Sequence, residues 1–215
     1  MVLGFVDADC RDEGLIFVDP RLLVASERQT RMILRQNLPL ADLSTLRKIG
    51  TMYPSPSRSG SEFVTQFDRV NSMISGNYPL LMANVDWIFN CNTRYLTSAY
   101  GQTYNYRYSL RPSIHAADLF LTFLDMKIDW QGKRNLVHVP YARAWQSYLI
   151  SFIKHGDPNV QRRPETIDWP SSGQEMKIVD LRWEGFVWKT DDQVDEDKCS
   201  YWQRADYAPK WNIST

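Results

Sequence analysis

The chain has 215 residues, of which 43% are apolar, and its 25 basic and 25 acidic side chains leave a formal net charge of zero. A chain of this length can bury about 70% of its unfolded surface around one core. The composition excludes disordered, collagen-like and coiled-coil proteins. Nucleic-acid binders usually carry a basic excess, which this chain does not have. No apolar run approaches the roughly 18 residues of a membrane helix, so we expect neither a nucleic-acid partner nor a membrane span.

The first half of the chain is predicted to begin with a strand and to continue with helices. Residues 2–6 form a short apolar run that is typical of a buried strand. Residues 7–14 are crowded with acids and are predicted to be a loop. Helix signals follow over residues 20–37 and 42–49. Apolar residues spaced along 85–100 predict an amphipathic helix.

The second half of the chain alternates predicted strands and helices. Tyrosines recur at every second position of residues 104–110, which predicts a strand with aromatic side chains on one face. Residues 142–153 predict a strong amphipathic helix that Gly156 ends. The other predicted elements are a helical turn over 118–125, strands over 176–181 and 186–189, and a charged loop over 191–198. This alternation indicates an α/β layer arrangement.

The cysteines and histidines give no sign of a metal site. Cys10, Cys91 and Cys199 are far apart, and no C-x-x-C pair supports a zinc ribbon or a redox pair. The three histidines are scattered, with no H-E-x-x-H motif. We therefore expect no metal and no cofactor.

Two loops that directly follow predicted strands each carry one titratable side chain. Glu13 follows the strand over residues 2–6, and His115 follows the strand over 104–110. Ligands of open α/β sheets bind outside the carboxyl ends of the strands, and a carboxylate there can orient an imidazole. From spacing alone the alternatives remain open, because a loop acid is usually a solvated surface group and a lone histidine is usually structural or exposed.

Five motifs occur in order along nearly the whole chain. Asp12-Glu13-Gly14 with Phe17 resembles a D-E-G-x-x-F run, and Ser113-Ile-His115-Ala-Ala-Asp118 resembles a histidine segment with an acid three residues after the histidine. The others are the Cys91 segment over 86–91, F-x-x-x-G-x-P-N with W-P over 152–170, and C-x-x-W over 199–202. Together they are similar to the type-B carboxylesterase, lipase and cholinesterase family, with a likeness to fungal secreted esterases.

The resemblance implies the C-terminal portion of an α/β-hydrolase fold, an incomplete sheet with flanking helices that forms one domain portion over residues 1–215. It implies that Glu13 and His115 are the acid and the base of a Ser–Glu–His triad. The nucleophile comes before the acid in this fold, yet no suitable serine precedes Glu13 and no G-x-S-x-G occurs. We therefore expect a truncated carboxylic-ester hydrolase that is inactive alone. Its substrate in a complete enzyme would be a small-molecule ester.

The resemblance also implies a disulfide between Cys91 and Cys199, and the alternative is a pair of buried thiols. A disulfide and the Asn212-Ile-Ser214 sequon point to an extracellular parent family. The first residues lack a basic stretch and have only a short apolar run, so we expect no signal peptide in this chain.

Two departures from the family pattern and one alternative function remain. Residues 76–85 look inserted, and the step from the strand over 2–6 to Asp12 is longer than usual.

An open edge on that first strand predicts association or aggregation through the sheet. The alternative function is a non-catalytic binding or interaction module derived from the esterase fold, whose aromatic side chains line an apolar pocket or a partner interface.

Overall fold

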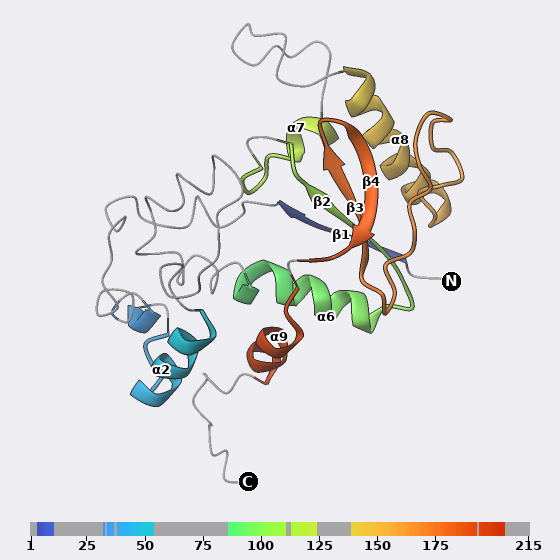
Figure 1. The fold of residues 1–215 in the computed structure, drawn as a ribbon. Coiled ribbons are helices and arrows are strands. Elements are labelled where there is room, and N and C mark those ends of the chain that lie inside the picture. Colours follow the sequence, from blue (N-terminus) through green and yellow to red (C-terminus); the bar gives the residue numbers. More distant parts are fainter. Residues whose placement is uncertain are drawn as a thin grey trace, which may run out of the picture. The chain divides into compact units, whose positions relative to one another are not determined.

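The computed structural model describes residues 4–10, 32, 34–36, 38–53, 86–110, 113–123, 139–192 and 194–204 (Figure 1). The chain divides into two compact units, which are described separately. Unit 1 consists of Met1–Glu13 and Thr93–Gln193, and unit 2 consists of Gly14–Asn92 and Val194–Thr215. None of the helices in these described ranges is long and apolar enough to cross a membrane.

Unit 1 is built on a four-stranded sheet with the order β1-β2-β3-β4. The strands β1 (Gly4–Cys10), β2 (Gln102–Tyr108) and β3 (Lys177–Arg182) are parallel, and β4 (Gly185–Thr190) is antiparallel to β3. The carboxyl ends of the three parallel strands therefore lie at one edge of the sheet, which is where α/β proteins place their sites.

Strand β1 is longer at its carboxyl end than the sequence predicts. Residues 7–10, predicted as part of an acidic loop, belong to the strand. The reason is the pairing with β2, which runs in register over the whole length of β1, from Gly4 opposite Gln102 to Cys10 opposite Tyr108. The backbone hydrogen bonds of this ladder outweigh the local preference of acidic residues for loops.

The two faces of β2 differ in chemistry although both are buried. Tyr104, Tyr106 and Tyr108 lie on one face, as the alternation predicts, and are at most 7% exposed. On the other face Asn105 and Arg107 are each only 1% exposed. A strand buried on both faces is typical of parallel sheets.

Helix α8 (Val139–His155) supplies the core of the aromatic face. Its Trp145 and Tyr148 side chains are fully buried, and the Trp145 ring lies 4.5 Å from the Tyr106 ring. Trp169 packs against both Trp145 and Tyr148, with ring centroids 5.4 Å apart in each case. Gly156 directly follows the helix, and its positive φ of 71° suits a glycine that ends a helix. The predicted helix over 142–153 and its C-terminal signal are confirmed.

Unit 2 contains the short helices α2 (Leu43–Met52), η3 (Asp86–Asn90) and α9 (Glu196–Gln203), and α6 (Cys91–Ala99) follows η3 across the unit boundary. The predicted helix over 85–100 is confirmed, but its first turn is a π-helix. The predicted charged loop over 191–198 is wrong in its second half. The Asp195 carboxylate caps α9 by accepting hydrogen bonds from the backbone N–H of Asp197 and Lys198.

A disulfide and a buried polar cluster hold unit 2 together. Cys91 and Cys199 are bonded, with their Cα atoms 5.0 Å apart, so the predicted disulfide is confirmed. The Tyr53 hydroxyl donates to the Asp86 carboxylate (2.8 Å) and accepts a hydrogen bond from the Trp202 indole N–H (2.8 Å). Together these contacts connect α9 to η3 and to the end of α2.

Candidate functional site

His115 lies on a tight turn that follows β2. The backbone N–H of Ala117 donates to the carbonyl of Ile114 (3.0 Å), so His115 and Ala116 are the two central residues of the turn. Ala116 has a φ of 65°, whereas His115 is not among the residues of positive φ. This combination is a type II turn, whose third position normally favours glycine. The sequence thus places the imidazole on a strained turn at the carboxyl edge of the parallel strands.

Buried residues on both sides fix this turn. Ser113 is 1% exposed and Ala117 is 2% exposed, whereas His115 between them is half-buried. Helix α7 (Leu119–Thr122) begins immediately afterwards, and its Leu121 is 1% exposed. The flanking residues therefore anchor the turn in the core while the imidazole keeps some access to solvent.

The Asp118 carboxylate links the turn to two neighbouring strands. Its Oδ2 accepts a hydrogen bond from the Tyr106 hydroxyl of β2 (2.6 Å), and its Oδ1 accepts one from the Cys10 thiol of β1 (3.8 Å). Burial, with Cys10 and Asp118 nearby, raises the pKa of Tyr108 to about 12. Tyr108 therefore stays neutral at physiological pH.

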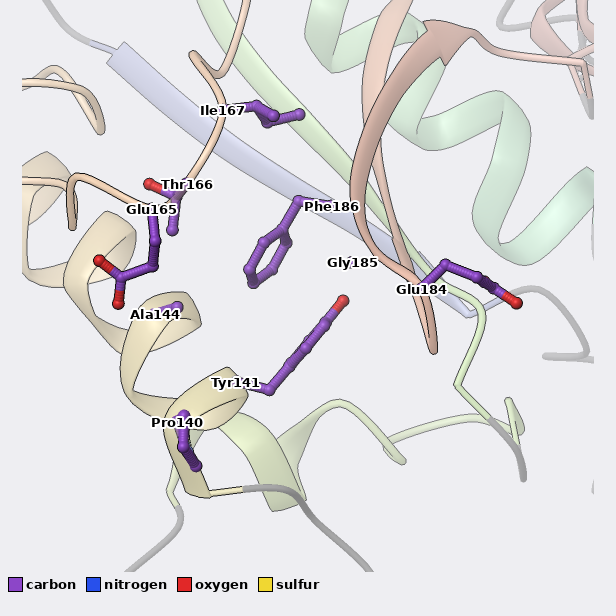
Figure 2. Close-up of a pocket in the computed structure, with 9 residues that line it drawn as sticks. All are labelled: Pro140, Tyr141, Ala144, Glu165, Thr166, Ile167, Glu184, Gly185 and Phe186. Carbon is purple, nitrogen blue, oxygen red and sulfur yellow. The ribbon is translucent and has the colours of Figure 1, made fainter.

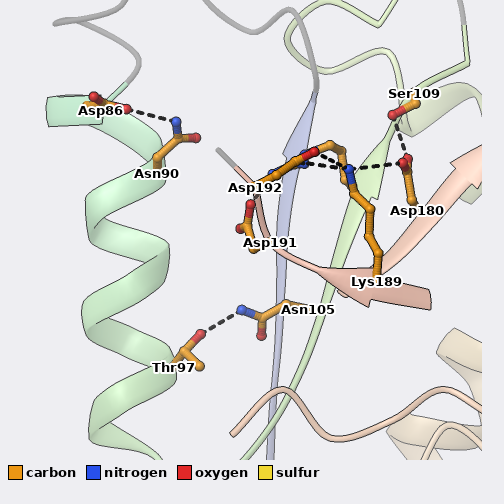
Figure 3. A network of polar contacts seen from close by, with 10 residues as sticks. Asp86, Asn90, Thr97, Asn105, Ser109, Asp180, Lys189, Asp191 and Asp192 are labelled. Atoms are coloured by element: carbon orange, nitrogen blue, oxygen red, sulfur yellow. Dashed lines mark hydrogen bonds and ion pairs between the residues drawn. The ribbon is translucent and has the colours of Figure 1, made fainter. Parts of the chain in front are cut away.

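A network of charged groups occupies the other side of β2 (Figure 3). Arg107 forms ion pairs with Asp191 and Asp192, and Lys189 also binds Asp192 at 2.8 Å. Burial acts to raise the pKa of Asp192, but the hydrogen bonds and charges of Lys189 and Arg107 prevail and lower it to about 2. The buried guanidinium is thus paired with two carboxylates, and the lowered pKa keeps Asp192 ionised at neutral pH.

The same network reaches the start of the His115 segment. The Ser109 hydroxyl donates to Asp180 Oδ1 (2.5 Å), and the Ser109 backbone N–H donates to the Leu181 carbonyl (3.0 Å). Ser109 is the first residue after β2. The exit of β2 toward His115 is therefore fixed on one side by β3.

Of the two predicted catalytic residues, the structure describes one. His115 lies at the expected edge of the sheet, whereas Glu13 lies outside the described residues, as do residues 76–85 and Asn212. The pairing of Glu13 with His115 remains a prediction. Within the described ranges, no group of three or more His, Cys, Asp or Glu side chains is arranged to hold a metal ion.

A separate hollow lies between the start of α8 and the turn that joins β3 to β4 (Figure 2). Its volume is about 330 Å³, and His115 is not among its lining residues. The Tyr141 and Phe186 rings are stacked at 4.5 Å in its wall, and Glu165 and Glu184 lie at its sides. The hollow is thus distinct from the His115 turn.

Sequence reasoning missed two sets of residues around the site. It identified Asp118 only as the acid that follows His115, and it assigned no contact to Cys10. It also overlooked the partners of Arg107, although an arginine inside a predicted strand of a parallel sheet requires a buried acid. Asp191 and Asp192 stand next to each other in the sequence and could have been proposed as the acids that neutralise Arg107.

Comparison with known proteins finds relatives among fungal enzymes. No family model matches the chain. The secreted lipase of Arthroderma benhamiae is 31% identical over 132 residues, which is 55% of this chain and 24% of that protein. Carboxylesterase patB of Penicillium expansum is 26% identical over 159 residues, 73% of this chain and 25% of that protein. Secreted lipase 4 of Gibberella zeae is 22% identical over 219 residues, 96% of this chain and 37% of that protein.

The fold is similar to that of a solved structure, EstA of Aspergillus niger. The TM-score is 0.67 at 19% sequence identity, and the likeness covers 93% of this chain and 39% of that one. The predicted fold class, part of an α/β-hydrolase fold, is confirmed by this likeness. The chain spans between about a quarter and two fifths of the length of the proteins that it matches.

Proposed function

Because the chain is homologous to fungal secreted lipases and carboxylesterases, we propose that it carries the acid and the base, Glu13 and His115, of a serine ester hydrolase. The nucleophilic serine would come from outside these 215 residues. The observation that carries the proposal is the position of His115 on a tight turn a few residues after β2, at the carboxyl edge of the parallel strands.

The contacts of Asp118 support the pairing of the two residues. Asp118 follows His115 by three residues, and its carboxylate contacts Cys10, the last residue of β1. Glu13 follows Cys10 by three residues in the sequence, and a three-residue segment spans at most about 11 Å. The acid loop and the histidine turn thus start from adjacent points of the sheet.

The proposed chemistry is acyl transfer to the external serine and then to water. His115 takes the serine proton during attack on the ester carbonyl and returns it to the leaving alcohol, and Glu13 holds the imidazole in the required tautomer. Water then clears the acyl-enzyme, with His115 again as the base. The substrate class is a small-molecule carboxylic ester.

The free side of β1 offers a place for the polypeptide that bears the serine. Strand β1 pairs with β2 on one side, and among the described strands none pairs with its other side. Such an edge presents backbone N–H and C=O groups that favour addition of a strand. We infer that a segment bearing the nucleophile pairs there, either on the same polypeptide or on another one.

Extracellular action is part of the proposal. Two of the relatives are named secreted lipases. The Cys91–Cys199 disulfide supports the same compartment, because disulfides persist in oxidising surroundings and are rare in the cytosol.

Complementation tests the proposed function. The 215-residue chain alone should not be labelled by a fluorophosphonate probe. Co-expression with the upstream part of a relative, such as the Arthroderma benhamiae secreted lipase, should restore hydrolysis of a chromogenic short-chain ester. His115→Gln should then lower turnover by several orders of magnitude, and the control His155→Gln, at the exposed end of α8, should not. Restored hydrolysis that survives His115→Gln would overturn the proposal.

The alternative of a non-catalytic binding module rests on aromatic side chains that line an open pocket. Trp145, Tyr148 and Trp169 are at most 1% exposed and are used in the core. Tyr141 and Phe186 do line the hollow of Figure 2. The ester hydrolase is favoured because the relatives are named lipases and carboxylesterases, whereas nothing about the hollow points to a particular binding partner.

A further inference from the structure

Asp118 occupies the N-cap position of α7 but does not cap it. Its backbone has φ −64° and ψ −23°, and its side chain makes no hydrogen bond to the N–H groups of its own helix. Aspartate at this position usually accepts such a bond, because the first N–H groups of a helix lack partners. The carboxylate is therefore committed to contacts outside the helix.

Both carboxylate oxygens bind side chains from the sheet. Tyr106 donates to Oδ2 at 2.6 Å, and the Cys10 thiol lies 3.8 Å from Oδ1. A phenolic hydroxyl is a good hydrogen-bond donor, whereas a thiol is a weak one, and the Tyr106 contact is also the shorter of the two. Tyr106 is thus the main anchor, and Cys10 is the secondary one.

The main anchor is rigid. The Tyr106 ring packs against the Trp145 ring at 4.5 Å and against the Trp169 ring at 6.0 Å. Tyr106 is 7% exposed, and both tryptophans are at most 1% exposed. A carboxylate bound to such a ring is held in one place relative to β2.

We propose that Asp118 is a positioning residue, which holds the His115 turn in a fixed place relative to the carboxyl ends of β1 and β2. The inference rests on the proposed function, in which Glu13 approaches from the end of β1. The turn needs such a clamp because Ala116 adopts a φ of 65°, a conformation that alanine leaves when it is not constrained. Displacement of a catalytic group by about 1 Å can cost 10²-fold in rate.

Nuclear magnetic resonance of the 215-residue chain tests the clamp without any ester turnover. The imidazole signals of a histidine-labelled sample report the place and the motion of each ring, and His115→Gln assigns the one of interest. In Tyr106→Phe and Asp118→Asn, the His115 signal should shift and broaden through exchange on the microsecond-to-millisecond timescale. The His155 signal should stay unchanged.

Tyr148→Phe is the matched control. Tyr148 belongs to the same aromatic cluster, and its hydroxyl donates to the Ile167 carbonyl (2.5 Å) rather than to Asp118. The substitution also removes one hydroxyl from a buried tyrosine. It should leave the His115 signal at its wild-type position, which separates the clamp from a general loss of packing.

Three results decide the inference. A wild-type His115 signal in folded Tyr106→Phe and Asp118→Asn would overturn it, as would an equal shift in Tyr148→Phe. Should both primary variants fail to fold, Asp118→Glu keeps a carboxyl group but moves it along the chain by one methylene, away from its place beside Tyr106. A wild-type His115 signal in that variant would also overturn the inference.

Activity after complementation separates this inference from the proposed function. Asp118→Asn should lower kcat roughly ten- to a hundredfold with little change in KM, because substrate binding does not involve the clamp. Unchanged kcat would overturn the positioning role. If complementation fails but the His115 signal is displaced in Tyr106→Phe and Asp118→Asn, the proposed function is refuted and the positioning role of Asp118 is supported.

Discussion

The two compact units shift the pKa values of two of their carboxylates, Asp192 and Asp86, in opposite directions. In unit 1, Arg107 and Lys189 supply positive charge that outweighs the effect of burial and lowers the pKa of Asp192 to about 2. In unit 2, burial raises the pKa of Asp86, whose hydrogen-bond donors include the neutral Tyr53 hydroxyl. Charge is thus balanced by charge in one unit and by neutral dipoles in the other. The units should therefore respond differently to reduction, charge removal and acid.

The largest expected effect is the loss of stability when the disulfide of unit 2 is removed. The Cys91–Cys199 bond closes a loop of 108 residues in sequence, and opening such a loop costs about 4–5 kcal/mol in the chain-entropy account. The double variant Cys91→Ala, Cys199→Ala should lower the free energy of unfolding in urea by that amount. Wild-type protein without reductant is the reference, and a loss below about 1 kcal/mol would contradict the prediction.

Removal of the central charge tests unit 1 next. Arg107→Ala should lower the free energy of unfolding by about 3–5 kcal/mol, because it leaves Asp191, only 3% exposed, as a buried charge without its main partner. Arg162→Ala is the control, since its partner Asp168 is 80% exposed and such pairs contribute about 0–1 kcal/mol. Urea unfolding of both variants measures the difference. Equal losses of unfolding free energy would show that the buried ion pairs stabilise the fold no more than an exposed pair does.

The fold was predictable wherever packing leaves a periodic trace in the sequence. The tyrosines of β2 and the apolar face of α8 alternate with the periods of strand and helix, so both elements were found. The polar residues Asn105 and Arg107 carry no such trace, because an alternating polar position ordinarily faces water. The buried Arg107 pairs with Asp191, 84 residues away, and the Asn105 amide donates to Thr97 on a neighbouring helix.

The site was predictable only in part for the same reason. The segment around His115 carries a local motif, and the structure places the imidazole after a strand as expected. The contact between Cys10 and Asp118 joins residues 108 positions apart. It exists because β1 and β2 pair in full register, a tertiary property that no local pattern encodes. The same applies to the carboxyl end of β1, which local composition assigns to a loop.

Lowering the pH should change the contributions of Asp86 and Asp192 to stability in opposite directions. Burial raises the pKa of Asp86 above its ordinary value of 3.8, so the folded state binds this proton more tightly than the unfolded state. The contribution of Asp86 to stability therefore rises as pH falls from neutral toward 3.8. Asp192 has the opposite sign, because its lowered pKa contributes stability above 3.8 that is lost as pH falls toward 2.

Asp86→Asn isolates that contribution. An amide oxygen can replace only one of the two carboxylate oxygens that accept from Tyr53 and Asn90, so the variant should lose about 1–3 kcal/mol. The loss should grow as pH is lowered from neutral, because the variant cannot take up the proton. Urea unfolding of both proteins across this pH range measures the change. A loss that is constant with pH, or that shrinks in acid, would refute the assignment of Asp86 as the responsible group.

The smallest effect concerns backbone strain from positive φ at residues other than glycine, which among the described residues occurs only in unit 1, at Ala116 and Met176. Ala116→Gly should raise the free energy of unfolding by about 1 kcal/mol, because glycine adopts positive φ without the steric cost that alanine bears. Ala117→Gly is the matched control, since Ala117 is 2% exposed and has no positive φ, and it should be destabilising. The gain should come with broader His115 imidazole signals, because the relaxed turn no longer dictates one orientation. A stabilised variant with unchanged His115 signals would show that Asp118, rather than the strained peptide, alone sets the position of the ring.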